Sequence, residues 1–125
     1  MSTIREISEE TGISPYTLRY YEREGILPYV KRDSSGNRLY DEESKEWLNF
    51  ILALRTTGMP LSEIKHYVDL YQEGESTLKL RRQLMLKHKA KVEKDLSETI
   101  KHLEQINYKL ALYDMQEKGL TNMLP

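Results

Sequence analysis

The 125-residue chain has no cysteine and little proline (4) or glycine (6). The absence of cysteine excludes disulfides, thiolate nucleophiles, thiol redox sensing and cysteine-based metal sites. No apolar run approaches the ~20 residues that a membrane span needs, and the chain opens with no signal-peptide pattern, so we expect a cytoplasmic protein without a membrane partner. A formal net charge of −1 gives no reason by itself to expect nucleic acid as a partner.

Two short helices are predicted near the start of the chain. Thr3 and Glu6 form a capping-box pattern at the start of the first helix, and Gly12 is typical of a helix end. The Ser14–Pro15 pair favours the start of a second helix, which we expect to run to about Glu24. Two short helices across a tight, glycine-containing turn predict a helix-turn-helix unit.

A β-hairpin and two further helices follow in the prediction. The extended runs 29–32 and 37–40 flank the turn-forming tetrapeptide 33–36. Asp41 is expected to cap a helix that runs to about Thr57, and Pro60 to begin another. The apolar positions that we expect to face a core are Trp47, Phe50, Ile51, Leu54, Leu61, Ile64, Tyr67, Val68 and Tyr71. Residues 1–73 are therefore predicted to form one small domain.

A single long helix is predicted from about Ser76 to Asp114, where helix formers dominate and proline and glycine are absent. At ~1.5 Å per residue it would be ~58 Å long. Nine positions spaced alternately by four and three residues include Lys89 and Thr99, and the other seven are apolar or aromatic: Met85, Val92, Leu96, Leu103, Ile106, Leu110 and Tyr113. This pattern predicts a coiled-coil seam, and the seam needs a partner, most simply a second copy of the chain. We assign residues 74–115 to this helix and 116–125 to a tail.

The start of the second predicted helix suits DNA recognition. A recognition helix needs polar side chains at the end that enters the major groove. Arg19 can form paired hydrogen bonds with guanine, and the hydroxyls of Tyr16, Thr17 and Tyr20 can bind bases or phosphates, while Leu18 and one tyrosine face inward. The alternative is an ordinary amphipathic helix with exposed tyrosines.

The hairpin adds a basic wing beside this helix. Lys31, Arg32 and Arg38 give the stretch from Arg19 to Arg38 a net positive charge within an otherwise acidic first half. On a narrow hairpin these side chains would lie over the DNA backbone and contribute affinity and salt dependence. The alternative is a solvated basic turn.

Several segments, in this order and spacing, resemble the MerR family of bacterial transcription regulators over about residues 2–115. They are Thr17-Leu18-Arg19-Tyr20-Tyr21-Glu22, Gly25-Ile26-Leu27, Gly36-Asn37-Arg38-Leu39-Tyr40, Trp47-Leu48-Asn49-Phe50-Ile51 and Leu54-Arg55-Thr56-Thr57-Gly58-Met59-Pro60-Leu61.

The resemblance implies a mostly α fold: a winged helix-turn-helix domain, a second wing made by the third and fourth helices, and an antiparallel coiled-coil homodimer. It implies DNA contacts through Arg19, Tyr20, Arg38 and Tyr40, with Tyr16, Thr17 and Lys31 behind them. Members of the family bind an inverted-repeat promoter and distort it so that its two elements realign for RNA polymerase. We expect no enzymatic activity and no cofactor, and the three histidines have no metal-site spacing.

Within the family, residues 50–55 and 72–77 resemble the short branch that responds to aldehydes and related electrophiles. That branch often carries a sensing cysteine where Ala53 stands, so its thiol mechanism does not carry over, and we expect no appended effector domain. A non-thiol effector site is conceivable among the aromatic and imidazole side chains Trp47, His66, Tyr67, Tyr71, Tyr108 and Tyr113. The alternative is that these side chains are plain core or interface.

Two other function classes stay open at this point. One is a DNA-architectural protein that bends DNA without responding to a signal, and the other is a coiled-coil adaptor whose head binds protein. An antiparallel rod would place two DNA-binding heads at its opposite ends, which favours half-sites about two helical turns apart over the single turn of ~34–36 Å.

Overall fold

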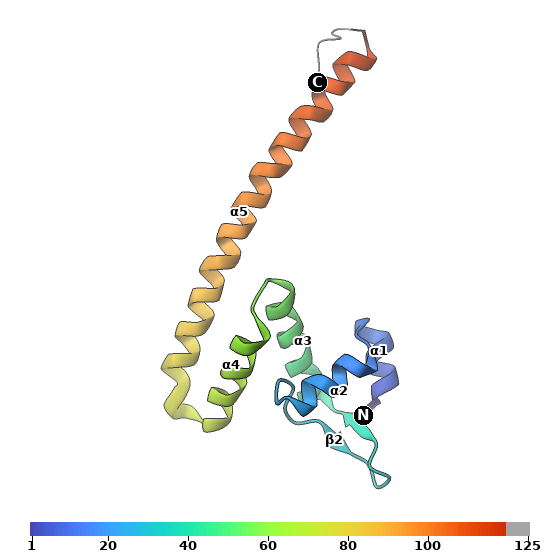
Figure 1. Ribbon diagram of the computed structural model, residues 1–125, viewed down its shortest axis with the longest axis vertical. Coiled ribbons are helices and arrows are strands. Elements are labelled where there is room, and N and C mark those ends of the chain that lie inside the picture. The colour runs from blue at the N-terminus through green and yellow to red at the C-terminus, as the bar shows by residue number, and fades with distance from the viewer. Residues whose placement is uncertain (120–125) are drawn as a thin grey trace. The chain divides into compact units, whose positions relative to one another are not determined.

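The computed structural model describes residues 1–119 and divides the chain into two compact units, Met1–Leu86 and Lys87–Pro125. Its elements are β1 (Ser2–Thr3), α1 (Ile4–Thr11), α2 (Pro15–Arg23), β2 (Lys31–Arg32), β3 (Arg38–Tyr40), α3 (Glu42–Thr56), α4 (Leu61–Glu73), the 3₁₀ turn η1 (Glu75–Thr77) and α5 (Leu78–Glu117) (Figure 1). The predicted mostly helical fold is confirmed. Within residues 1–119 no helix combines the length and apolarity of a membrane span. Most of the predicted tail, residues 120–125, lies outside the described residues.

The helix-turn-helix unit is built from local capping contacts. The Thr3 hydroxyl accepts a hydrogen bond from the Glu6 amide (3.1 Å), and the Glu6 carboxylate accepts one from the Thr3 amide (3.0 Å). Gly12 ends α1 in the left-handed conformation (φ 76°), which a side chain would strain. Ser14 then caps α2 by accepting from the Thr17 amide (3.1 Å). The predicted pair of helices and its turn are confirmed.

The wing is a three-stranded antiparallel sheet in the order β1-β3-β2. The Asp33 carboxylate closes the hairpin turn by accepting hydrogen bonds from the Ser35 and Asn37 amides (2.9 and 2.8 Å). The predicted hairpin is present, with shorter strands. We did not predict β1, whose Ser2 pairs with Tyr40, because two residues carry no alternation pattern.

One hydrophobic core holds the first unit together. Its most buried side chains come from α1, α2, β3, α3 and α4: Ile7, Leu18, Tyr40, Leu48, Ile51, Ile64 and Val68. Ile51 and Leu54 are buried as predicted, whereas Trp47 and Phe50 only pack against the edge of the core. Tyr71 remains partly exposed, and Leu70 of the same helix is buried instead.

Helix α5 continues without a break from Leu78 to Glu117. It begins two residues later than predicted, because η1 and Gly74 (φ 104°) turn the chain first. Within residues 87–119 it is the only helix, and most of the predicted seam is exposed there: Leu96, Leu103, Ile106, Leu110 and Tyr113. Met85, which we expected in the seam, instead packs against the core of the first unit.

Candidate nucleic-acid interface

Helix α2 turns its apolar residues inward and leaves a polar face outside. Leu18 and Tyr21 are buried, as predicted for the inner face. Tyr16 is 72% exposed near the start of the helix, and Arg19 is exposed one turn later. The structure thus gives α2 the exposed, polar N-terminal end that major-groove contact requires.

The other two α2 residues proposed for DNA contact are partly engaged within the helix. Thr17 accepts a hydrogen bond from the Ser14 hydroxyl (3.0 Å), which ties its side chain to the N-cap. Tyr20 is partly buried, and the Arg23 guanidinium lies 5.6 Å from the centre of its ring. Both are therefore less available to a partner than Tyr16 and Arg19.

The wing carries its basic side chains in ion pairs. Lys31 lies 3.2 Å from Asp41, the residue that also caps α3 by accepting from the Ser44 amide. That backbone hydrogen bond, reinforced by Lys31, holds the pKa of Asp41 below its usual range. Lys31 is consequently anchored at the base of the wing, beside the start of α3.

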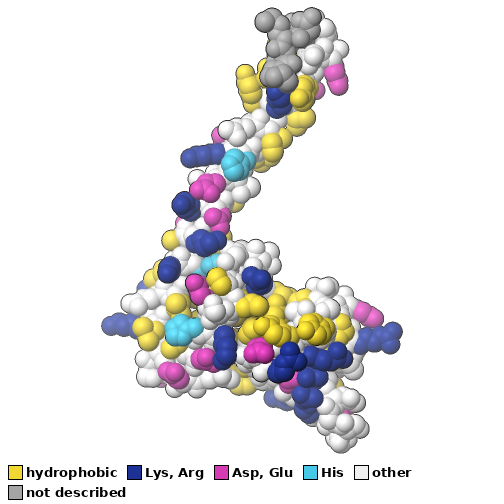
Figure 2. All heavy atoms as spheres, in the orientation of Figure 1, with side chains coloured by type: hydrophobic (Ala, Val, Ile, Leu, Met, Phe, Trp, Pro, Cys, Tyr) yellow, Lys and Arg dark blue, Asp and Glu magenta, His cyan; other side chains and the backbone are white. Residues whose placement is uncertain are grey.

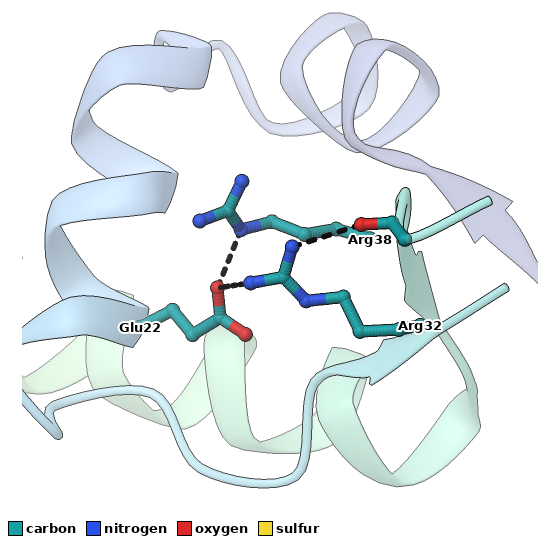
Figure 3. Close-up of polar contacts among 4 residues, drawn as sticks. Glu22, Arg32 and Arg38 are labelled. Atoms are coloured by element: carbon teal, nitrogen blue, oxygen red, sulfur yellow. Dashed lines mark hydrogen bonds and ion pairs between the residues drawn. The ribbon is translucent and has the colours of Figure 1, made fainter.

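Glu22, near the end of α2, joins the recognition helix to the wing. One oxygen of its carboxylate, Oε1, accepts hydrogen bonds from Arg32 Nη2 (3.0 Å) and from Arg38 Nε (Figure 3). Arg32 Nη1 in turn donates to the Gly36 carbonyl in the hairpin turn (3.0 Å). The sequence analysis gave Glu22 no role of its own; the only signal was an acidic residue set among arginines.

A basic hollow of about 260 Å³ lies between α1, α2 and the wing. Arg5, Arg19, Arg38 and Asn37 are among the residues that line it. In Figure 2, lysine and arginine side chains gather on the part of the first unit (Met1–Leu86, here called the head) where Figure 1 shows α2 and the hairpin. This face has the positive charge that a phosphate backbone attracts, although the whole chain is slightly acidic.

Tyr40 is not where the family resemblance placed it. Its side chain is 0% exposed and belongs to the core, and its hydroxyl has no hydrogen-bond partner within residues 1–119. Burial raises the pKa of this phenol above its ordinary value. The unpredicted strand β1 makes β3 the central strand of the wing, and Tyr40 faces the helices. We therefore correct the expected direct DNA contact: in this structure Tyr40 supports the wing from beneath.

The residues proposed for an effector site are only partly brought together. Trp47 contacts Tyr71 edge-on (ring centroids 4.7 Å apart) and Tyr67 (6.3 Å), and Tyr29 joins this group at 6.2 Å from Trp47. His66 is exposed on α4 and makes none of these ring contacts among the described residues. No sequence signal pointed to Tyr29, which adopts a left-handed backbone conformation (φ 66°).

The other two aromatic candidates for the effector site come from α5. Tyr108 and Tyr113 belong to the second unit. Ala53, which we expected to stand in place of a sensing cysteine, is exposed on α3.

Comparison with known proteins gives consistent matches over most of the chain. Residues 2–70 match the family model described as MerR HTH family regulatory protein, and residues 45–112 match the model described as MerR, DNA binding. An uncharacterised HTH-type transcriptional regulator of Haemophilus influenzae is 37% identical over 111 residues, which cover 89% of this chain and 82% of that protein. The HTH-type transcriptional regulator AdhR of Bacillus subtilis is 39% identical over 82 residues, 66% of this chain and 59% of AdhR.

A solved structure also resembles the whole chain. HiNmlR, described as a MerR family regulator lacking the sensor domain and bound to promoter DNA, superimposes with a TM-score of 0.85 at 35% sequence identity. The match covers 93% of this chain and 92% of that one.

Proposed function

This chain belongs to the MerR family and is a DNA-binding transcription regulator of that type, and we propose that it binds an inverted-repeat promoter as a homodimer and acts by distorting the DNA. The observation that carries the proposal is the exposed N-terminal end of α2 beside a basic wing. It is supported by the similarity to a regulator whose structure was solved on promoter DNA.

We propose two kinds of DNA contact, base contacts from α2 and phosphate contacts from the wing. We assign base contact to Arg19 and Tyr16, because they are exposed at the end of α2 that enters the groove. Lys31 and Arg38 of the wing serve as phosphate contacts, which position the head and contribute salt dependence. Thr17 and Tyr20 support the helix and contribute secondary contacts.

A second copy of the chain is the partner that fits the exposed stripe on α5. Leu96, Leu103, Ile106 and Leu110 are each more than half exposed. Burying such a side chain fully contributes ~1.5–3 kcal/mol, and about half of that burial remains to be gained from a partner, so each side chain adds ~1 kcal/mol when two helices pair. An antiparallel arrangement, as the family resemblance implies, places the half-sites about two helical turns apart.

The proposal extends to how the bound protein controls transcription. Distorting the promoter lets RNA polymerase engage both of its elements, and the cost of distortion is met by two bound half-sites. The site proposed for an effector is the aromatic group of Trp47, Tyr67 and Tyr71. A thiol mechanism is excluded by Ala53 and by the lack of cysteine.

Selection of bound duplexes from a random library, at two salt concentrations, tests the function. The proposal predicts an enriched inverted repeat whose affinity falls steeply as salt rises. Salt-sensitive binding to every duplex without enrichment would favour an architectural protein instead. No binding to any duplex would favour the coiled-coil adaptor.

A further inference from the structure

The two arginines held by Glu22 have different hydrogen-bonding partners. Glu22 is 19% exposed, so its carboxylate is partly shielded from water at the junction of α2 and the wing. Arg32 and Arg38 both donate to the same oxygen, Oε1. The two side chains meet at this oxygen, but their remaining N–H donors have different surroundings (Figure 3).

Arg32 uses both of its terminal nitrogens within the protein. Nη2 donates to Glu22, and Nη1 donates to the Gly36 carbonyl in the hairpin turn. Through these two hydrogen bonds Arg32 links the hairpin turn at Gly36 to Glu22 of the recognition helix α2. Arg32 thus holds the hairpin turn to α2 by two contacts within the protein, and each of its terminal nitrogens has one N–H left for a partner.

Arg38 gives Glu22 only its Nε–H. Its two terminal nitrogens, which carry four further N–H donors, point away from Glu22 in Figure 3. The same side chain lines the basic hollow together with Arg5 and Arg19. The Arg38 side chain is 21% exposed. A guanidinium held at Nε, with both Nη groups directed away from Glu22, keeps the planar fork that binds a phosphate through two parallel hydrogen bonds.

We propose that Glu22 is a positioning residue for DNA recognition: it fixes the wing against α2 and orients Arg38 so that its two Nη groups meet a backbone phosphate. This inference rests on the proposed DNA-binding function. A free arginine side chain samples many rotamers, and fixing it before DNA arrives reduces the ordering cost of binding. The contribution is indirect, because the Glu22 carboxylate itself repels phosphate.

Because of that repulsion, the direction in which Glu22→Gln changes DNA affinity distinguishes a positioning role from a purely electrostatic one. Replacing Glu22 by glutamine raises the net charge by one, so overall electrostatics alone would tighten DNA binding. A positioning role predicts the opposite, because the amide holds the arginines by weaker, uncharged hydrogen bonds. Glu24→Gln is the matched control, because it makes the same charge change two residues further along the chain. Among the described residues the Glu24 carboxylate pairs only with its neighbour Arg23 (Oε1 to Nε, 3.8 Å).

The test measures affinity for the selected inverted repeat over a series of salt concentrations. For Glu22→Gln we expect binding about tenfold weaker and a slope of log affinity against log salt reduced by about one phosphate contact per head. For Glu24→Gln we expect unchanged or tighter binding and an unchanged slope. Unchanged or tighter binding by Glu22→Gln, or equal losses in both variants, overturns the proposal. Failure of the wild-type chain to bind any duplex would instead overturn the proposed function.

A double-mutant cycle shows whether Glu22 acts through Arg38. Combined with Arg38→Ala, the Glu22→Gln change should weaken binding clearly less than the tenfold expected in the wild-type background, because the side chain that it orients is gone and only the Arg32 contact is left to lose. Additive losses overturn the proposal. Circular dichroism melts check that each variant is folded. If Glu22→Gln is unfolded, Glu22→Asp takes its place, since it keeps the charge and shortens the reach, and the same weakening and the same cycle decide.

Discussion

Leu103→Ala tests the dimer seam. This side chain is 53% exposed in the single chain, so the substitution should affect the contacts with a partner helix more than the fold of the chain itself. About half of a leucine's burial remains to be gained from a partner, which is ~1 kcal/mol per copy. The unfilled space in the seam raises the loss to about 1.5 kcal/mol per copy. Over two copies this is about 3 kcal/mol, so we expect dimerisation to weaken roughly 100-fold.

Tyr108→Ala is the matched control for this change. Tyr108 is 67% exposed, but five residues after Leu103 at 3.6 residues per turn it lies on the opposite side of α5 from the seam. Sedimentation equilibrium over a range of protein concentrations measures both variants. Dimerisation that is unaffected by Leu103→Ala, or equally affected by Tyr108→Ala, would refute the seam.

Three further predictions concern the head. Ser14→Ala removes the N-cap of α2 and should lower the free energy of unfolding by about 1 kcal/mol in urea titrations, whereas an equal stability would contradict the capping contact. The folded-state pKa of Asp41 is depressed, first by the Ser44 amide and then by Lys31, so its contribution to stability is complete above the unfolded pKa of ~4 and is lost as the pH falls through the lower folded value. Asp41→Asn should therefore flatten the fall of stability below about pH 4, and an unchanged pH profile would count against this linkage. Tyr40→Phe removes a buried hydroxyl that has no partner, so stability should be unchanged or higher by up to ~1 kcal/mol and DNA affinity unchanged; weaker DNA binding would restore Tyr40 as a contact.

The helix boundaries of the head were predictable because their causes are local. The Thr3–Glu6 box, Gly12 and Ser14 each act within four residues, and each makes the contact that its spacing implies. The start of α5 was placed two residues early, since nothing in the sequence distinguishes a 3₁₀ turn from the first turn of an α-helix.

The features missed by the sequence analysis depend on contacts between distant residues. Strand β1 exists because Ser2 meets Tyr40, thirty-eight positions away, and this pairing also places Tyr40 in the core. Glu22 becomes a junction only when the hairpin folds back on α2, which brings Arg38, sixteen residues further along the chain, to its carboxylate. Spacing patterns along one helix or one strand carry no information about such meetings.

The proposed DNA-contact residues were also predictable only as far as local sequence patterns reach. The sequence identified Arg19, Tyr16 and Lys31 as surface residues of the head, because helix and strand periodicity determines which side chains face out. Charge and spacing alone treated Arg32 and Arg38 alike, and only the family resemblance singled out Arg38. In the structure the Arg32 side chain donates to the Gly36 carbonyl of the hairpin turn, whereas Arg38 donates its Nε–H to Glu22. That distinction requires the geometry of the folded wing.

The mass of the complex on a selected inverted repeat tests the central claim most directly. Size-exclusion chromatography with light scattering, at a protein concentration well above the dissociation constant, counts the 14.8-kDa chains bound to each duplex. A sequence-specific homodimeric regulator requires two chains on the intact repeat and a large loss of affinity when one half-site is scrambled. One chain per duplex, or equal affinity for the intact and scrambled repeats, would contradict it.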